Sequence, residues 1–382
     1  MRRRGLPGVL ALCWSLWWSL GSAAQDAAPP PPHPDFAPLE GWAADNHAEA
    51  IPALLSACRA LGAMAPALPL GGDDRTRVPA RAMQPLCAEA ATLPPGDAAA
   101  ARAFLERRFR PMPLGEDTLT GYFELELNGS LTRSPRFPVP LLGRPPGLVE
   151  VDLGAFAPDL AGRRIVGEVR EGRLHPLPDR AGIAAGRLEG RAPVIAWVDE
   201  RVDAFFLEIQ GSGRVRLPDG RLLRVGYAAA NGHPYWPIGR ALLERGILTR
   251  ETISMQAIRA WLLGAPGAEA QALMARNPSY VFFRRVELAD DEGPIGALGV
   301  PLVPMRALAV DRAFVPFGLP VWVSGRDPLT DAPLRRLTVA KDTGGAIRGP
   351  ARADLFTGWG PEAAERAGRM RDPARLWVLM PR

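Results

Sequence analysis

Two aspartates near the C-terminal end of the sequence are the strongest candidates for chemistry. They begin and end the run DTGGAIRGPARAD, which extends from Asp342 to Asp354. We expect one strand to end at Asp342 and a second strand-like run to end at Asp354. Gly344 and Gly345 would let the backbone turn tightly or approach a ligand closely. Two carboxylates at neighbouring strand or loop ends are suited to proton transfer.

Each aspartate also has a purely structural interpretation. Asp342 could cap the turn by accepting hydrogen bonds from the two glycine amides that follow, and Asp354 could pair with Arg352 or another arginine. The triplet Asp342-Thr343-Gly344 is also the signature of aspartic proteases, in which two aspartates share one proton. Because the sequence contains this triplet once, a protease of that kind would have to dimerise.

The other reactive side chains form no comparable pattern. The histidines are scattered, with no i,i+4 pair and no neighbouring cysteine, so we expect neither a metal centre nor a cofactor. They are His33, His47, His175 and His233. Ser212 has His233 within reach along the chain, but Gly-Ser-Gly lacks the G-x-S-x-G elbow that a serine hydrolase needs.

If the substrate is a glycan, as the family resemblance described below implies, polar and aromatic residues in the middle of the sequence are candidate ligands for its sugars. Amide and hydroxyl groups can bond the acetamido and hydroxyl groups of a glycan, and aromatic rings can stack on sugar faces. The candidates are Gln210, Ser212, Asn231, Tyr122, Tyr235 and Trp236. For each of them, a role in a turn or in the core is the alternative.

Apolar residues at helical spacing predict helices towards both ends of the chain. One covers Ile51 to Leu61 and another Ala101 to Phe109. Thr249 is expected to cap a helix that carries Ile258, Trp261 and Leu262. Pro266 and Pro361 are expected to open two more, because proline is favoured in the first helical turn.

Between about Gly121 and Tyr235 the pattern changes to period two with frequent glycine and proline, which predicts a β-rich module. Its clearest part is a hairpin, with Pro218-Asp219-Gly220 as the turn. Four more strands are predicted in the C-terminal third, at Ala307–Val310, Pro320–Val323, Leu334–Lys341 and Leu376–Met380.

The N-terminus has the layout of a secretory signal peptide. Three arginines at positions 2–4 precede an apolar run from Leu6 to Leu20, which is shorter than the ~20 residues of a membrane span. We expect cleavage after Ala24, export, and a flexible Pro-rich segment at 25–40. A lipoprotein is the alternative, although Cys13 lies inside the apolar run without the small residues that usually precede a lipidated cysteine.

Loss of the signal peptide would lower the formal net charge from +5 to +2, because residues 1–24 contain three arginines and no acid. A nearly neutral chain gives little reason to expect nucleic acid as a partner. Cys58 and Cys87 would be the two remaining cysteines, and in an oxidising compartment such a pair is expected to form a disulfide. The length of the chain predicts two domains.

Several long runs of the sequence resemble the lytic transglycosylase A (MltA) family of peptidoglycan-cleaving enzymes. They lie in order between about Gly121 and Met380: GYFELELNGS, FFLEIQGSGRVRLPDGRLLRVGYAAANGHPYWPIGR, NPSYVFFR, GALGVPLVPMRALAVDRAFVPFGLPVWV and DTGGAIRGPARADLFTGWGPEAAERAGRM. The resemblance implies a mainly β chain with flanking helices (α+β). A double-psi β-barrel domain would comprise 41–135 and 250–382, a second β domain would be inserted at 136–249, and glycan would lie in the groove between them.

The resemblance also implies a role for each aspartate. Asp354 matches the family's catalytic acid, and Asp342 matches a nearby aspartate of the same site. A lytic transglycosylase uses the C6 hydroxyl of the muramyl residue where a glycosidase uses a second carboxylate or water. Asp354 would protonate the glycosidic oxygen and then take the proton of that hydroxyl, leaving a 1,6-anhydromuramyl end. An acid of this kind needs a pKa raised by burial or by a like charge, which Asp342 could supply.

The chain departs from the family's usual residues at four positions, and none of these removes the candidate acid. They are Lys341, Pro237, Ala307 and Leu125, where glutamine, serine, serine and proline are usual. The implied partner is the glycan strand of peptidoglycan, in the periplasm of a Gram-negative bacterium, with association with the outer membrane or a cell-wall synthesis scaffold. The alternative is a module that binds polysaccharide without cutting it, and the retained Asp354 argues for catalysis.

Overall fold

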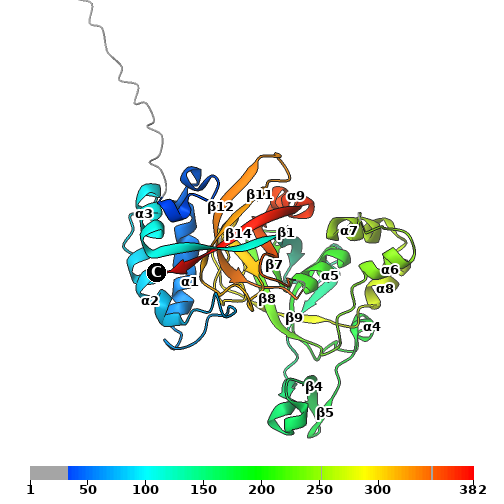
Figure 1. The fold of residues 1–382 in the computed structure, drawn as a ribbon. Helices are drawn as coiled ribbons and strands as arrows, with labels where there is room; N and C mark the ends of the chain where they lie inside the picture. Colours follow the sequence, from blue (N-terminus) through cyan, green and yellow to red (C-terminus); the bar gives the residue numbers. More distant parts are fainter. Residues whose placement is uncertain (1–32, 251, 346) are drawn as a thin grey trace, which may run out of the picture. The chain divides into compact units, whose positions relative to one another are not determined.

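The computed structural model describes residues 33–250, 252–345 and 347–382 (Figure 1). The predicted signal peptide, 1–24, and the first part of the predicted Pro-rich segment lie outside these residues. The described helices are α1 Ile51–Gly62, α2 Ala80–Ala90, α3 Ala98–Arg108, α4 Arg180–Ala184, α5 Arg201–Gln210, α6 Gly239–Glu244, α7 Met255–Gly264, α8 Gly267–Ala275 and α9 Gly360–Arg369. None of the helices in these ranges is long and apolar enough to cross a membrane.

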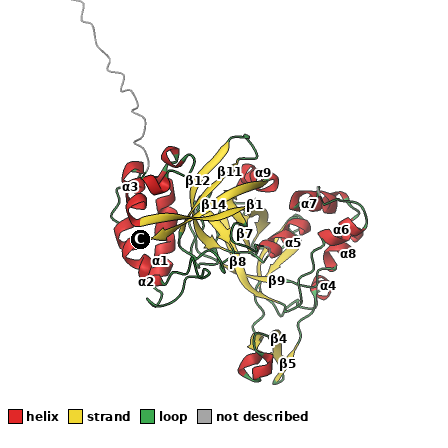
Figure 2. Ribbon diagram, in the orientation of Figure 1, coloured by secondary structure: helices red, strands yellow, loops and turns green. Residues whose placement is uncertain are grey.

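Strands dominate the fold, and helices flank them (Figure 2). The strands are β1 Phe109–Ser130, β2 Val139–Leu142, β3 Leu148–Asp152, β4 Arg164–Arg170, β5 Arg173–His175, β6 Val194–Val198, β7 Ser212–Arg216, β8 Leu222–Ala230, β9 Val281–Arg285, β10 Ala307–Val310, β11 Pro320–Arg326, β12 Pro333–Asp342, β13 Ala353–Trp359 and β14 Arg371–Pro381. The chain is therefore a mixed α+β protein in which β structure predominates, as the sequence predicts.

Six strands close into a barrel. Their order is β13-β10-β12-β11-β14-β1, and β1 also pairs with β13, so the ring has no free edge. The pairs β1–β13 and β10–β12 are parallel, whereas β1–β14, β11–β12, β11–β14 and β10–β13 are antiparallel. Closure satisfies the backbone groups that an open sheet would leave unpaired at its edges.

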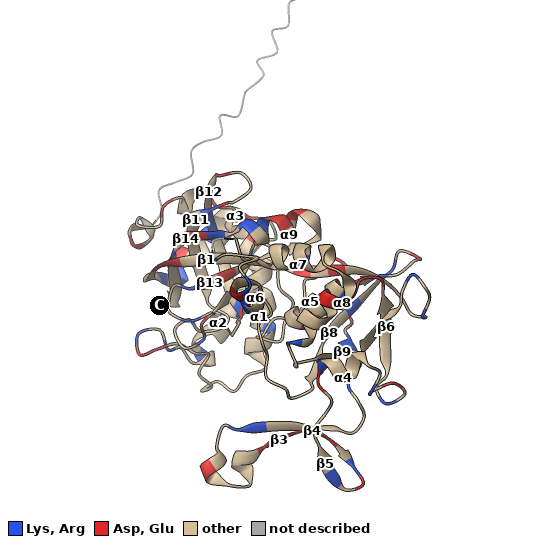
Figure 3. Cartoon of the chain, turned by 90° about the vertical axis from the view of Figure 1, so that its right-hand side faces the viewer, with Lys and Arg blue, Asp and Glu red and all other residues tan. Residues whose placement is uncertain are grey.

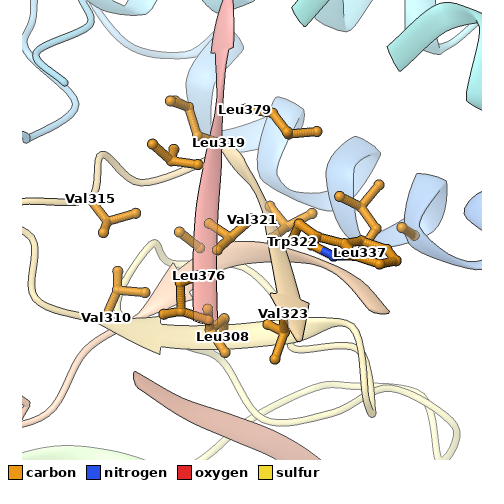
Figure 4. Packing of buried hydrophobic residues seen from close by; sticks show 14 of the residues in the cluster. Leu308, Val310, Val315, Leu319, Val321, Trp322, Val323, Leu337, Leu376 and Leu379 are labelled. Atoms are coloured by element: carbon orange, nitrogen blue, oxygen red, sulfur yellow. The ribbon is translucent and has the colours of Figure 1, made fainter. Parts of the chain in front are cut away.

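The barrel is filled by aliphatic side chains, and one large aromatic lies on its outer side against the N-terminal helices. Figure 4 shows Leu308 and Val310 of β10 packed together with Val321 of β11 and Leu376 of β14, all of them buried. Trp322 is fully buried and meets Trp42 edge to face at 5.2 Å between ring centroids. Removing a large side chain from such a core typically destabilises a domain by about 2–5 kcal/mol.

The segment before α1 corrects one prediction. The sequence predicts a flexible segment over 25–40, but the described part begins with a 3-10 helix, Pro34–Phe36, and packs against the barrel. Phe36 and Leu39 are both buried in the same hydrophobic cluster as Trp322. The prolines suggested flexibility, and the two apolar side chains between them supply enough buried surface to anchor the segment.

Helices α1 and α2 pack against each other, and a disulfide between Cys58 and Cys87 joins them, with Cα atoms 5.5 Å apart. Both helices contribute to the barrel's hydrophobic cluster, and they lie together with α3 at one side of the barrel in Figure 1. The disulfide that the sequence predicts is thus placed between two helices of the barrel domain.

The middle of the chain forms a second β module with its own core. Strands β7, β8 and β9 extend the sheet from the far half of β1, while β2 and β6 pair beside them. Leu127, Phe205, Val215 and Phe283 belong to this second cluster. A separate three-stranded sheet, β3-β4-β5, follows β2 in sequence.

Helix α5 lies where the sequence predicts only β structure. Val202, Phe205 and Phe206 recur at helical spacing, Glu200 caps the first turn by accepting from the amide of Val202, and Gly211 ends the helix with a left-handed backbone. The strand patterns on both sides concealed this short amphipathic segment. A smaller correction concerns α7, which Ser254 caps, whereas Thr249 bonds Thr252 before the helix begins.

Candidate active site

Asp354 is the second residue of β13, not the last residue of a strand as predicted. It pairs with Thr120 on β1 and with Ala309 on β10. Pro350 explains the difference, because proline lacks the N–H that a strand ladder requires and delays pairing until Ala353. Asp354 is therefore held between two neighbouring strands of a closed barrel, which gives its carboxyl group a fixed position.

One oxygen of the Asp354 carboxyl group is held by two donors. Its Oδ1 accepts from the hydroxyl of Thr120 and from the guanidinium of Arg352. The same guanidinium donates to Thr120 Oγ1 at 3.0 Å, so the three side chains form one network. The pairing with Arg352 foreseen in the structural interpretation of Asp354 is present, but about a quarter of the carboxyl side chain is still exposed, at 23 %. Among the described residues Oδ2 accepts no hydrogen bond.

Asp342 is the last residue of β12, as predicted, and lies across β10 from Asp354. Ala309 pairs with Asp342 on one side and with Asp354 on the other. Since adjacent strands are about 4.8 Å apart, the Cα atoms of the two aspartates lie roughly 10 Å from each other. The two carboxyl groups are thus brought together by a single intervening strand.

The Asp342 carboxyl group is engaged by both of its oxygens. Oδ1 accepts from the amide of Ala297 at 2.9 Å, and Oδ2 accepts from the hydroxyl of Tyr122 at 2.9 Å. Burial raises the pKa of Asp342 above its usual value, these hydrogen bonds oppose the shift, and the charge of Asp354 adds to it. The sequence predicts a raised pKa for the acid itself, Asp354, with Asp342 as the like charge; the carboxyl group whose pKa burial raises here is Asp342. The amides it binds are not those of Gly344 and Gly345.

Tyr122 is half-buried and faces inward. Its ring lies 5.3 Å from that of Phe356, and its hydroxyl donates to Asp342. Burial and the neighbouring carboxylates raise the pKa of Tyr122 well above its usual value, so the hydroxyl stays protonated as a donor. These contacts make Tyr122 a support for Asp342, whereas the sequence suggests a ring that stacks on sugar.

A cavity of about 610 Å³ opens beside Asp342. Gln210 at the end of α5 and Ser212 at the start of β7, both predicted sugar ligands, line it together with Asp342 and Thr343. Ala297 lines it as well, whereas Asp354 does not. The cavity therefore joins residues of the second β module to the end of β12.

Asn231 corrects the predicted ligand set. It is 1 % exposed, and its Nδ2 donates to the carbonyls of Pro178 and Pro278 at 3.0 and 2.9 Å. Its Oδ1 accepts from the amide of Tyr280 at 2.9 Å. These bonds tie two loops together, so the side chain has no group left for a sugar.

The remaining predicted residues lie outside the cavity. Tyr235 is 56 % exposed, and the ring of Trp236 is covered by the guanidinium of Arg276 at 4.2 Å. His233 contacts the carbonyl of Leu177 at 2.9 Å, so the ring serves that loop and no Ser212–His233 pair is formed. Gly344 and Gly345 follow Asp342 in a turn closed by the amide of Ile347 and the carbonyl of Gly344.

Sequence reasoning missed two buried carboxylates in the cavity wall. The Glu124 carboxylate forms ion pairs with the guanidinium groups of Arg214 and Arg224, with N···O distances of 2.8 and 2.9 Å. All three side chains are buried. Glu208 lies 2.8 Å from Arg180, yet burial raises the pKa of Glu208 to about 7. In the alternating run ELEL, Leu125 and Leu127 take the core face, so the pattern places Glu124 on the opposite face and gives no sign of its burial. No signal marks Glu208 within FFLEIQ either.

Family comparisons match most of the chain. Residues 118–284 match the model of the MltA specific insert domain, and residues 306–380 match that of the 3D domain. Membrane-bound lytic murein transglycosylase A of Escherichia coli K12 is 35% identical over 273 residues, which cover 69% of this chain and 66% of that protein. The protein of that name from Vibrio cholerae is 36% identical over 208 residues, 53% of this chain and 55% of its own length.

Solved structures are similar over more of the chain. MltA from Neisseria gonorrhoeae has a TM-score of 0.76 and 32% identity, covering 91% of this chain and 90% of that one. A membrane-bound lytic murein transglycosylase from Agrobacterium tumefaciens has a TM-score of 0.77 and 38% identity, covering 91% and 96%. E. coli MltA with bound chitohexaose has a TM-score of 0.58 and 31% identity, covering 79% and 82%.

Proposed function

The chain belongs to the family of membrane-bound lytic murein transglycosylase A, and we propose that it cleaves the glycan strands of peptidoglycan. The bond is the β-1,4 link between N-acetylmuramic acid and N-acetylglucosamine, and the product carries a 1,6-anhydromuramyl end. The observation that carries this proposal is the pair of carboxyl groups flanking Ala309, one of them beside a cavity of about 610 Å³.

Asp354 acts as the proton-transfer group in this proposal. Protonated on Oδ2, it donates the proton to the glycosidic oxygen as the bond from C1 to that oxygen breaks. The carboxylate then removes the proton from the C6 hydroxyl while O6 forms a bond to C1. The carboxyl group ends protonated, as it began, and no water is consumed. Thr120 and Arg352 on Oδ1 stabilise the carboxylate between the two transfers. Acid–base catalysis of this kind contributes about 10²–10⁴-fold.

Asp342 shapes the site without transferring the proton. Its two oxygens are occupied by Ala297 and Tyr122, which fix the carboxyl group at the cavity. Its charge favours positive charge that develops at C1 in the transition state. Removal of this carboxylate should therefore reduce turnover less than removal of Asp354.

Gln210 and Ser212 are the proposed ligands for the sugar's polar groups. They line the cavity from the second β module, opposite the end of β12. The amide of Gln210 can accept from an acetamido N–H and donate to a hydroxyl, and Ser212 can do either. The chitohexaose bound to the E. coli relative supports an oligosaccharide as the ligand.

Envelope location is also proposed. The relatives are named as membrane-bound, and the predicted signal peptide would direct export to the periplasm. Attachment to the outer membrane or to a cell-wall synthesis scaffold would bring the enzyme to its substrate. Cell fractionation with sequencing of the mature N-terminus tests this: a cytoplasmic protein that retains residues 1–24 would contradict it.

Purified sacculi provide the test of the reaction. Wild-type protein should release fragments lighter by one water than hydrolysis products, and Asp354→Asn should lower turnover by at least about 10²-fold while binding to sacculi persists. Asp117→Asn, an exposed aspartate on β1, is the matched control and should behave as wild type. Products with a reducing muramyl end would identify a hydrolase. Binding without any fragment release would identify a glycan-binding module.

A further inference from the structure

Lys341 is the single lysine of the chain, and its side chain is fully buried. It precedes Asp342 on β12, at the bulge where the pairing of β12 with β10 shifts register. Nζ donates to Ser56 Oγ on α1 at 2.9 Å and to the carbonyl of Pro301. The ammonium group therefore ties a helix and a loop to the strand that ends in Asp342.

The loop that Lys341 contacts is short and closed. Ile295 and Pro301 form an isolated β-bridge, and the amide of Gly296 donates to the carbonyl of Val300 at 3.0 Å. Ser56 Oγ also lies 3.2 Å from the carbonyl of Pro301, which makes that carbonyl the point where helix, strand and loop meet. We call this segment the 295–301 loop.

The same loop holds the end of β12 at two further points. The amide of Leu298 donates to the carbonyl of Lys341 at 3.0 Å, and the amide of Ala297 donates to Asp342 Oδ1 at 2.9 Å. Ala297 also lines the cavity. A shift of the loop would thus move a donor of Asp342 and part of the cavity wall together.

We propose that Lys341 is a positioning residue: it fixes the 295–301 loop through Pro301 and Ser56, and through that loop it fixes the Asp342 carboxyl group. The proposal rests on the proposed function of the site, since it assigns a part in that reaction to a residue that touches no substrate. Lys341 acts on Asp342 and on the cavity through Ala297, whose amide bonds Asp342 Oδ1 and which lines the cavity.

The charge of Lys341 is isolated. Arg59 on α1 is a like charge, and Asp342 is bonded by the Ala297 amide and the Tyr122 hydroxyl. Neither the 295–301 loop nor β10 carries a titratable side chain. Burial and the charge of Arg59 lower the pKa of Lys341 to about 7. A charged donor makes the stronger hydrogen bond to a carbonyl, so the hold on the loop weakens as pH rises through about 7.

Two variants of Lys341 separate the effect of its hydrogen-bond donor from the effect of its positive charge. Lys341→Met removes the donor and should lower kcat on soluble glycan strands roughly tenfold with little change in KM, because Asp342 is displaced while the sugar ligands stay in place. Lys341→Gln keeps a neutral hydrogen-bond donor, so it should retain most of kcat. Because glutamine does not titrate, the fall of kcat with rising pH that Lys341 causes should be absent in this variant. Wild-type kcat in a folded Lys341→Met protein would overturn the proposal.

Arg59→Gln provides the decisive comparison. Removing this like charge should move the alkaline decline of kcat to higher pH in the wild-type background and leave it unmoved in the Lys341→Gln background. An equal shift in both backgrounds would assign the effect to another group and overturn the proposal. Circular dichroism and thermal unfolding of each variant establish that the compared proteins are folded.

Hydrogen exchange gives a readout that does not depend on activity. The amides of Ala297 and Leu298 should exchange faster in Lys341→Met than in wild type, and unchanged exchange would contradict the proposed hold on the loop. If the wild-type protein releases no anhydro-ended product, the proposed function fails by itself, and faster exchange would still show that Lys341 fixes the loop.

Discussion

Asp342 and Asp354 carry the same side chain but meet different partners. Asp354 shares one oxygen between Thr120 and Arg352, whereas both oxygens of Asp342 are occupied by neutral donors. Burial raises the pKa of Asp342 and so favours its protonated form. One strand of separation is thus enough to place two aspartates in unlike surroundings.

Asp342→Asn should stabilise the protein at neutral pH while reducing turnover. The pKa of Asp342 is raised by burial, so the native state binds more protons than the unfolded state between the usual and the raised value. The contribution of Asp342 to the free energy of unfolding is complete below the pKa that it has in the unfolded chain. This contribution declines as pH rises from that value through the raised pKa of the folded protein. The variant's melting temperature should therefore exceed that of wild type more at pH 7 than at pH 4. An advantage that is largest at pH 4 would contradict this sign.

Asn231→Ala should destabilise the protein by about 2–4 kcal/mol, because the buried side chain satisfies two carbonyls and one amide. Asn128→Ala is the matched control, since that asparagine is exposed and makes one hydrogen bond, to Asp199. Denaturant unfolding measures both. Turnover per folded molecule should be unchanged in Asn231→Ala. A large rise in KM would instead show that Asn231 binds the sugar, against the evidence of its burial.

The predicted site was partly readable from the sequence. Asp342, Asp354, Gln210 and Ser212 stand in short motifs, and the resemblance to a family gave the aspartates their roles. Thr120, which bonds Asp354, is 234 residues away in the chain and belongs to no motif. Such partners are set by strand register, which a single sequence does not reveal.

At the level of elements, the short C-terminal strands were predictable and β1 was not. Apolar runs bounded by glycine and proline mark β10, β11, β12 and β14. The first half of β1 contains Pro111 and Pro113, which cannot donate to a ladder, so the sequence argues against a strand there. Pairing with Leu379 and Trp377 of β14 overrides that local signal. Helix α5 was concealed for the opposite reason, because strand-like runs flank it.

Gly211→Ala should lower both stability and kcat/KM. Gly211 has φ +79 and joins Gln210 to Ser212, so an added side chain strains the backbone that positions the two proposed sugar ligands. The expected loss of stability is about 1 kcal/mol. Gly220→Ala, at φ +86 in the β7–β8 turn, is the control: it should lose similar stability and keep kcat/KM. Equal kinetic effects would show that strain, and not ligand position, is responsible.

In the whole molecule, two hydrophobic clusters share one strand. Leu119 of β1 belongs to the barrel cluster and Leu125 to the cluster of the second module. The buried Glu124 between them binds Arg214 and Arg224 of that module, and Arg214 lies 3.7 Å from the ring of Trp359 on β13.

The domain bounds 41–135, 136–249 and 250–382 remain predictions, which limited proteolysis of the folded protein can test. Acidic and basic residues are interspersed along the described chain (Figure 3).

Reduction of the disulfide should lower global stability without altering the reaction. Cys58 and Cys87 are 29 residues apart, and closing a loop of that length stabilises by about 3.6 kcal/mol in the chain-entropy model. Cys58→Ser with Cys87→Ser should therefore unfold at lower denaturant concentration, with kcat unchanged below the transition. Equal midpoints with and without reductant would show that the bond contributes nothing to the folded protein.

The long strand β1 also sets an order of events as the chain emerges, N-terminus first, into the compartment where it folds. Phe109 pairs with Pro381 and Leu119 pairs with Ala353, so the partners of β1 emerge only after the second β module. Until then the strand has no neighbour on the barrel side, and α1–α3 have no sheet to cover. The second module can therefore fold while the barrel is still open, and the last strands to be made close the ring that holds Asp354.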